Sequence, residues 1–131
     1  MKAIGYVRMS TDEQASDGVS LEAQRKRIEG YCVAKDWTLV DVKQDPGCSA
    51  KNMKRLGLQE ILSQLRDVDA VIVYKLDRLT RSVSDLNIML ERFKKCHVSL
   101  VSLSESLDAT TATGELMLNL LISVSHGSAR L

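Results

Sequence analysis

Two short stretches of the sequence gather residues that could act on a phosphate ester. The stretch "RMST" holds Arg8 and Ser10, and "KLDRLTRS" holds Asp77, Arg78 and Arg81 directly after the apolar run "DAVIVY". An arginine stays charged, and its planar fork of donors fits phosphate oxygens. A serine hydroxyl among arginines could attack phosphorus while the guanidinium groups stabilise the developing negative charge without a metal ion.

Asp77 has two possible roles in such a site. It could act as general acid or base for the departing or attacking oxygen, or it could only orient the arginines. A purely structural interpretation also exists, since Ser10 could be a turn residue and Asp77 with Arg81 a helix-surface ion pair of about 0.2–0.5 kcal/mol. Each residue taken singly favours that structural interpretation, but their occurrence together favours a site.

The elements that would position these residues follow an alternating order. Apolar β-type runs alternate with segments of helical periodicity, which predicts a mainly parallel sheet. The predicted strands are residues 2–8, 37–42, 69–74 and 98–103, and the predicted helices are residues 20–36, 56–65, 83–96 and 114–125. Residues 43–55 and 105–115 are predicted to be loops. The expected fold class is α/β, with a four-stranded, mainly parallel sheet flanked by helices.

In open α/β sheets, ligands bind beyond the carboxyl ends of the strands. Three predicted strands are followed there by the candidate residues, which are Arg8 and Ser10, Arg55, and the group Asp77, Arg78 and Arg81. This convergence at one edge of the sheet is the main reason to interpret them as one site.

Composition limits the function further. The 131 residues include 18 basic and 17 acidic side chains, a formal net charge of +1, whereas DNA-binding modules are usually strongly basic. Affinity for nucleic acid would therefore come from elsewhere. Cys32, Cys48 and Cys96 are widely spaced, which argues against zinc and predicts reduced thiols in the cytoplasm. No P-loop or dinucleotide motif occurs, and no apolar run is long enough for a membrane span, so no cofactor and no membrane partner are expected.

The segment Leu116–Val124 is apolar around most of a helical circumference. Such a helix is either fully buried or shared with another chain. Because a domain of this size offers limited depth, the sequence favours a subunit interface.

These motifs, in this order and spacing, resemble the catalytic domain of the serine recombinase (resolvase/invertase) family, and most closely the large serine integrases and transposases. The stretches that carry the resemblance are "YVRMSTDEQ", "SLEAQ", "DPGCSAKNMKRLGLQEIL", "VYKLDRLTRS" and "TATGELMLNLLISVS". The resemblance covers residues 2–125, and "KLDRLTRS" is its most specific part.

The resemblance implies a role for each matching residue. Ser10 would be the nucleophile that joins a DNA 5′-phosphate and frees a 3′-hydroxyl. The other implied site residues are Arg8, Gln24, Arg55, Asp77, Arg78 and Arg81. It also implies double-stranded DNA as partner, strand exchange in a tetramer, no cofactor, and a cytoplasmic bacterial or phage-encoded protein of a mobile element.

The sequence departs from the family at two places. Leu56 stands where most large members have proline, and residues 126–131, "HGSARL", replace the expected Gln-Trp-Glu-Arg-Glu-Ala that opens a long oligomerisation helix. Loss of one base from codons for that motif yields the observed residues. We therefore expect a catalytic domain over residues 1–125, an aberrant or truncated tail over 126–131, and little recombination by this fragment alone.

Two other functions remain compatible with the residues. The arginine cluster could belong to a regulator that binds a phosphate ester or nucleotide without covalent chemistry. The chain could also be an accessory module that holds DNA complexes through the helix Leu116–Val124. The first alternative would survive loss of the Ser10 hydroxyl, and the second would survive loss of Arg78.

Overall fold

The computed structural model describes residues 1–9, 20–46, 56–80 and 82–130. Its five-stranded sheet has the order β2-β1-β3-β4-β5, with β1 to β4 parallel and β5 antiparallel to β4. The strands are β1 (Lys2–Met9), β2 (Thr38–Pro46), β3 (Ala70–Val73), β4 (Ser99–Ser102) and β5 (Leu107–Asp108). The α/β class with a mainly parallel sheet is thus confirmed.

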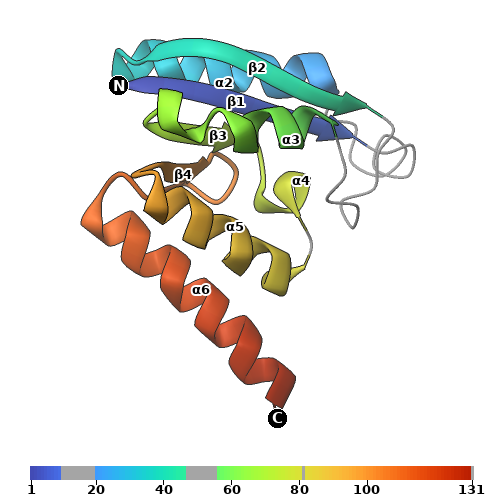
Figure 1. Ribbon diagram of the computed structural model, residues 1–131, viewed down its shortest axis with the longest axis vertical. Helices are drawn as coiled ribbons and strands as arrows, with labels where there is room; N and C mark the ends of the chain where they lie inside the picture. Colours follow the sequence, from blue (N-terminus) through green and yellow to red (C-terminus); the bar gives the residue numbers. More distant parts are fainter. Residues whose placement is uncertain (10–19, 47–55, 81, 131) are drawn as a thin grey trace.

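Helices connect the parallel strands and cover both faces of the sheet (Figure 1). They are α2 (Leu21–Lys35), α3 (Leu56–Ser63), the 3-10 turn η1 (Leu65–Asp67), α4 (Leu76–Leu79), α5 (Val83–Lys95) and α6 (Ala112–Arg130). Serine side chains cap the first turns of α2 and α5. Ser20 Oγ accepts a hydrogen bond from the Ala23 amide at 3.1 Å, and Ser82 Oγ accepts one from the Asp85 amide at 3.3 Å.

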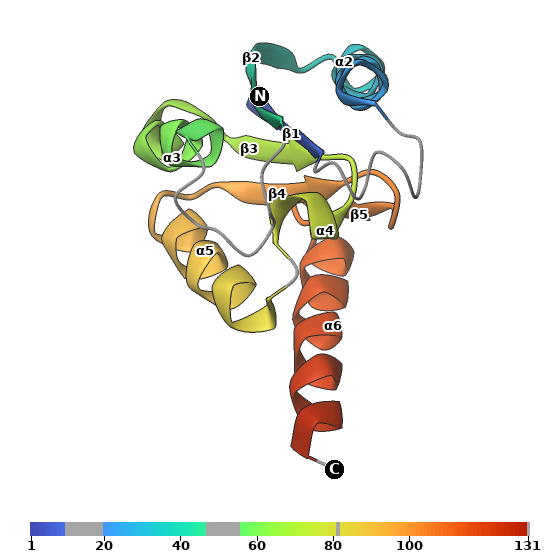
Figure 2. The same ribbon diagram turned by 90° about the vertical axis from the view of Figure 1, so that its right-hand side faces the viewer.

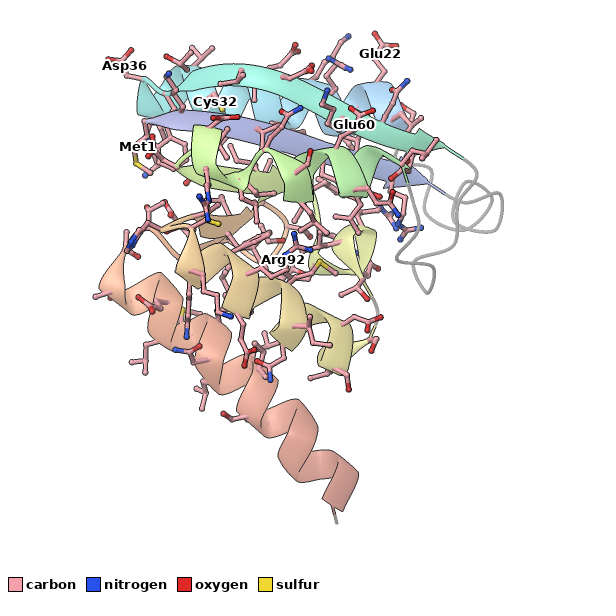
Figure 3. All side chains as sticks on the ribbon, in the orientation of Figure 1. Met1, Glu22, Cys32, Asp36, Glu60 and Arg92 are labelled. Atoms are coloured by element: carbon pink, nitrogen blue, oxygen red, sulfur yellow. The ribbon has the colours of Figure 1, made fainter. Side chains whose placement is uncertain are left out.

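The sheet separates two hydrophobic cores. Figure 2 shows α2 on one face and α3 and α5 on the other. Cys32 is buried between α2 and the sheet (Figure 3), where burial raises the pKa of its thiol. The second core is larger and lies under α3, α4, α5 and α6. Its largest fully buried apolar side chains are Tyr6, Phe93, Ile4, Leu58, Ile61, Leu79 and Met89.

Alternation along β1 decides which side of the sheet receives the candidate site. Ala3 and Val7 belong to the α2 core, whereas Ile4 and Tyr6 belong to the core under α3 and α4. Successive side chains in a strand point to opposite faces, so Arg8 follows Tyr6 onto the α4 side. The site is therefore built on the face that carries the larger core.

The structure corrects the bounds of two predicted elements and adds two more, so the sheet has five strands and not the expected four. Strand β2 continues to Pro46, so residues 43–46 are not part of a loop. The four-residue helix α4 and the two-residue strand β5 were both missed. Helix α6 begins at Ala112, two residues earlier than predicted, and continues to Arg130. The two missed elements are too short to show a hydrophobic period.

Helix α6 turns only a narrow stripe to the protein core and projects away from the other elements (Figures 1 and 2). Leu118 and Ile122 are buried, whereas Leu116, Leu120 and Val124 are 67%, 60% and 60% exposed. The three exposed residues, Leu116, Leu120 and Val124, follow one another at intervals of four and therefore share one face of the helix. Full burial of this helix within one chain is therefore excluded for the residues described. No helix in the described part of the chain is long and apolar enough to cross a membrane.

The Asp108 carboxylate connects the segment before the amino end of α6 to helix α2. Asp108 accepts a hydrogen bond from Tyr31 Oη at 2.8 Å and from the Thr110 amide at 2.9 Å, and Lys35 Nζ lies 3.9 Å away. Burial alone would raise the pKa of Asp108, but these hydrogen bonds and the Lys35 charge outweigh it and leave the pKa below its ordinary value. The carboxylate is therefore ionised at neutral pH and can hold the β5–α6 turn against α2.

Gly114 allows α6 to pass directly over β5. A Cβ atom at this position would overlap the Asp108 carbonyl, whereas a Cβ at Gly30, on α2, would meet no atom within 4 Å. We expect Gly114→Ala to lower the free energy of unfolding by about 1–3 kcal/mol, as overpacking does. Gly30→Ala should raise it by roughly 0.5–1 kcal/mol, because alanine favours the helix. Urea unfolding of both variants measures this, and a neutral Gly114→Ala would contradict the close packing.

Candidate active site

The centre of the candidate site is a buried contact between Arg8 and the short helix α4. Arg8 Nε donates to the Arg78 carbonyl at 2.8 Å, and Arg8 Nη2 donates to the Asp77 carbonyl at 2.6 Å. Arg8 is fully buried. The last carbonyls of a helix have no partner within it, so the guanidinium supplies donors that α4 itself lacks. The end of β1 and helix α4 are thereby held together.

Gln24 holds the backbone of the same arginine. Its Nε2 donates to the Arg8 carbonyl at 3.1 Å, and its Oε1 accepts from the Arg8 amide at 3.4 Å. Gln24 is fully buried on α2. The structure thus brings Gln24 into the predicted site, and its amide extends the hydrogen bonding of β1 on the side that faces α2.

Asp77 and Arg78 are adjacent residues of α4, but their side chains differ in exposure to solvent. The Arg78 side chain is 1% exposed and that of Asp77 is 40% exposed, and Arg78 Nη1 lies 3.5 Å from Asp77 Oδ1. A buried guanidinium stays charged and is costly to bury, so such groups occur where they bind anions or carboxylates. This arrangement places two buried cations and one accessible carboxylate at the carboxyl ends of β1 and β3.

Three predicted site residues, Ser10, Arg55 and Arg81, lie outside the described residues. Four others, Arg8, Gln24, Asp77 and Arg78, are within the structure and lie together at one edge of the sheet. Among the residues that the structure describes, no cluster of three or more His, Cys, Asp or Glu side chains could hold a metal ion.

Asp45 and Tyr6 support this edge and were missed by the sequence analysis. Asp45 lies opposite Arg8 in the pairing of β2 with β1. Its carboxylate accepts hydrogen bonds from Tyr6 Oη at 2.8 Å, from the Gly57 amide at 2.7 Å and from the Leu58 amide at 3.0 Å. An acid in this position satisfies amides at the amino end of α3. Asp45 therefore sets where α3 begins, directly after Arg55 in the chain.

Gly57 makes this close approach possible. A Cβ atom there would lie 2.8 Å from the Gln44 carbonyl oxygen and 3.1 Å from the Asp45 carboxylate. A signal for Tyr6 and Asp45 did exist in the sequence. Tyr6 is two residues before Arg8 on one strand face, and Asp45 is an acid directly before Pro46 at a strand end.

Comparisons with known proteins agree with this arrangement. The model of the family "Resolvase, N terminal domain" matches residues 3–131. The chain belongs to the serine recombinase (resolvase/invertase) family. It is 31% identical to the transposon Tn917 resolvase of Enterococcus faecalis over 93% of this chain and 60% of that protein. It is 30% identical to the DNA-invertase of Escherichia phage P1 over 90% of this chain and 57% of that protein.

The fold is also that of solved serine recombinase structures. The N-terminal catalytic domain of TP901-1 integrase superposes with a TM-score of 0.87 and 34% identity, over 99% of this chain and 98% of that one. The catalytic domain of ISC1926 TnpA, an IS607-like serine recombinase, gives a TM-score of 0.69 at 28% identity over 99% of this chain and 84% of that one. The chain thus matches a whole recombinase catalytic domain but less than two thirds of the resolvase and the invertase.

The Asp45 cluster provides a test of how the recombinase site is supported. We expect Asp45→Ala to lower the free energy of unfolding by roughly 2–4 kcal/mol, because it leaves two buried amides and the Tyr6 hydroxyl without their acceptor. Tyr6→Phe should cost about 1–2 kcal/mol. The double variant should cost less than the sum, because both changes remove one shared hydrogen bond. Urea unfolding of the four proteins decides this, and strict additivity would contradict the contact.

Proposed function

We propose that this domain cleaves and rejoins double-stranded DNA at specific sites, through a covalent phosphoserine intermediate at Ser10. The Ser10 oxygen attacks the phosphorus of a phosphodiester, and the bond from phosphorus to the 3′ oxygen breaks. The Ser10 proton leaves to a base, and the departing 3′ oxygen takes up a proton. The phosphate ester is kept as a serine ester on the 5′ end, so rejoining needs no outside energy source.

The remaining residues divide into charge stabilisation and positioning. Arg78, with Arg55 and Arg81, would neutralise the phosphoryl oxygens in the transition state. Arg8 would add to this field while it holds α4. Asp77 would either exchange a proton with the 3′ or serine oxygen or orient the neighbouring guanidinium groups. Gln24 would hold the end of β1 in register.

The observation that carries this proposal is the burial of Arg8 and Arg78 at adjacent strand ends, beside the accessible Asp77. Such a cluster suits a phosphodiester, and membership of the serine recombinase family makes DNA the expected substrate. The near-neutral charge of the chain is consistent with DNA affinity that resides in other parts of the protein. We propose residues 1–125 as the catalytic domain, acting in the cytoplasm of a bacterium on a mobile element.

The central prediction concerns Ser10. A full-length recombinase that contains this domain, incubated with labelled DNA from the ends of its own mobile element, should form a protein–DNA complex that survives denaturation. Ser10→Ala should abolish that complex completely, because no other group supplies the attacking oxygen. Mass spectrometry of the digested complex should place the DNA on Ser10.

Native gel shift of the Ser10→Ala protein is the control, because the variant should still bind the same DNA. Covalent complex formation by this variant would contradict the assignment of the nucleophile. DNA that binds the wild-type protein natively but never becomes attached would instead indicate a non-covalent phosphate-binding regulator.

We further propose that a second copy of the recombinase packs against the exposed face of α6. Leu116, Leu120 and Val124 form that face and are each exposed by 60% or more. A buried charge in a subunit interface has no water to solvate it. Leu120→Glu should therefore weaken self-association of the full-length protein by at least about tenfold, equal to 1.4 kcal/mol. Sedimentation velocity measures this.

Asn87→Glu is the matched control, because Asn87 is likewise exposed but lies on the neighbouring helix α5 and not on α6. It should leave self-association within about threefold of the wild type. Equal weakening by both variants would contradict an interface on the Leu116, Leu120 and Val124 face.

A further inference from the structure

The amino end of α4 is held by a carboxylate from a distant turn. Glu105 lies between β4 and β5, and its Oε2 accepts a hydrogen bond from the Leu76 amide at 3.3 Å. Lys75, the residue before α4, provides no side-chain cap. The carboxylate of Glu105 therefore takes the place that a serine or aspartate cap occupies in other helices.

The Glu105 carboxylate is itself held in place. The Ser102 hydroxyl at the end of β4 donates to Glu105 Oε1. The turn that carries Glu105 is fixed to the strand before α4, because the Leu103 amide donates to the Val73 carbonyl at 3.0 Å and the Ser104 amide donates to the Tyr74 carbonyl at 2.8 Å. Backbone and side chain of one turn thus hold a continuous stretch from the end of β3 into α4.

The charges at the two ends of α4 complement each other. The anionic Glu105 lies at the amino end, and the cationic Arg8 binds carbonyls at the other end. This is the arrangement that the helix dipole favours. Because α4 has only four residues, its own hydrogen bonds cannot hold it, and external partners must fix its position.

We propose that Glu105 is a positioning residue of the reaction, which fixes α4 so that Asp77 and Arg78 meet the scissile phosphate in the productive geometry. The proposal rests on the proposed function and extends it to a residue outside the strand-end cluster. Glu105 lines a hollow of about 310 Å³ whose wall also includes Asp77 of α4 and Leu121 of α6. Glu105 thus lies next to the site without being part of it.

A structural experiment tests the contact without any DNA. Glu105→Ala, Glu105→Gln and the control Glu91→Ala, at an exposed position on α5, are compared by ¹H–¹⁵N NMR of this chain. In Glu105→Ala the amide resonances of Leu76, Asp77 and Arg78 should move, while Glu105→Gln, which keeps an acceptor oxygen, should stay close to the wild type. Unchanged Leu76 and Arg78 resonances in Glu105→Ala would overturn the proposal.

A kinetic experiment tests the consequence in the full-length recombinase. At saturating DNA, Glu105→Ala should slow formation of the covalent complex by about 3- to 30-fold, the equivalent of one lost helix cap. The Kd for DNA should be unchanged, Glu105→Gln should recover the rate to within about threefold, and Glu91→Ala should match the wild type.

The outcomes separate a positioning role from general stability. A lower thermal midpoint with a normal rate at saturating DNA, or a loss confined to DNA affinity, would overturn the proposal. A wild-type protein that never forms a covalent complex would overturn the proposed function, and the Leu76 resonance would still decide whether Glu105 holds α4.

Discussion

The hydrogen bonds from the buried Arg8 guanidinium to the carbonyls of α4 are the interaction on which the rest of the site depends. Arginine keeps its charge under all ordinary conditions, so it cannot become neutral by losing a proton when it is buried. Its burial therefore requires hydrogen-bond acceptors for the guanidinium group. The carboxyl end of a helix supplies such acceptors. Each group therefore satisfies the other, and β1 is held to α4 at the point where the chain proceeds towards Ser10.

This constraint explains why α4 exists at all. Four residues are far too few for a helix to persist in water. Helix α4 is instead fixed by partners on β1 and on the β4–β5 turn, and by Leu76 and Leu79, which pack into the larger core. The positions of Asp77 and Arg78 are thus properties of the tertiary structure. The same reasoning applies at α3, whose first amides are satisfied by Asp45 from β2.

The sequence predicts the elements that are long enough to show a periodic spacing of apolar residues. The buried run Ala70–Val73 and the convergence of Arg8 with Asp77 and Arg78 were both predicted and are observed. Helix α4 and strand β5 could not be predicted, because two to four residues carry no period. The hydrogen bond between Glu105 and the Leu76 amide joins residues 29 positions apart, which leaves no local pattern in a sequence.

The polar segment between β4 and α6, which the sequence indicates as a plain connection, has two structural tasks. Its first part, through Glu105, holds the amino end of α4, and its second part, through Asp108, fixes where α6 leaves the sheet. Both tasks require polar side chains and tight turns, including Ser106 at a positive φ of 53°. These requirements produce the composition of a loop. The exposed face of α6 and the charged residues of α4 are consequently positioned by one continuous stretch of backbone, so the orientation of the helix and the geometry of the site share a common support.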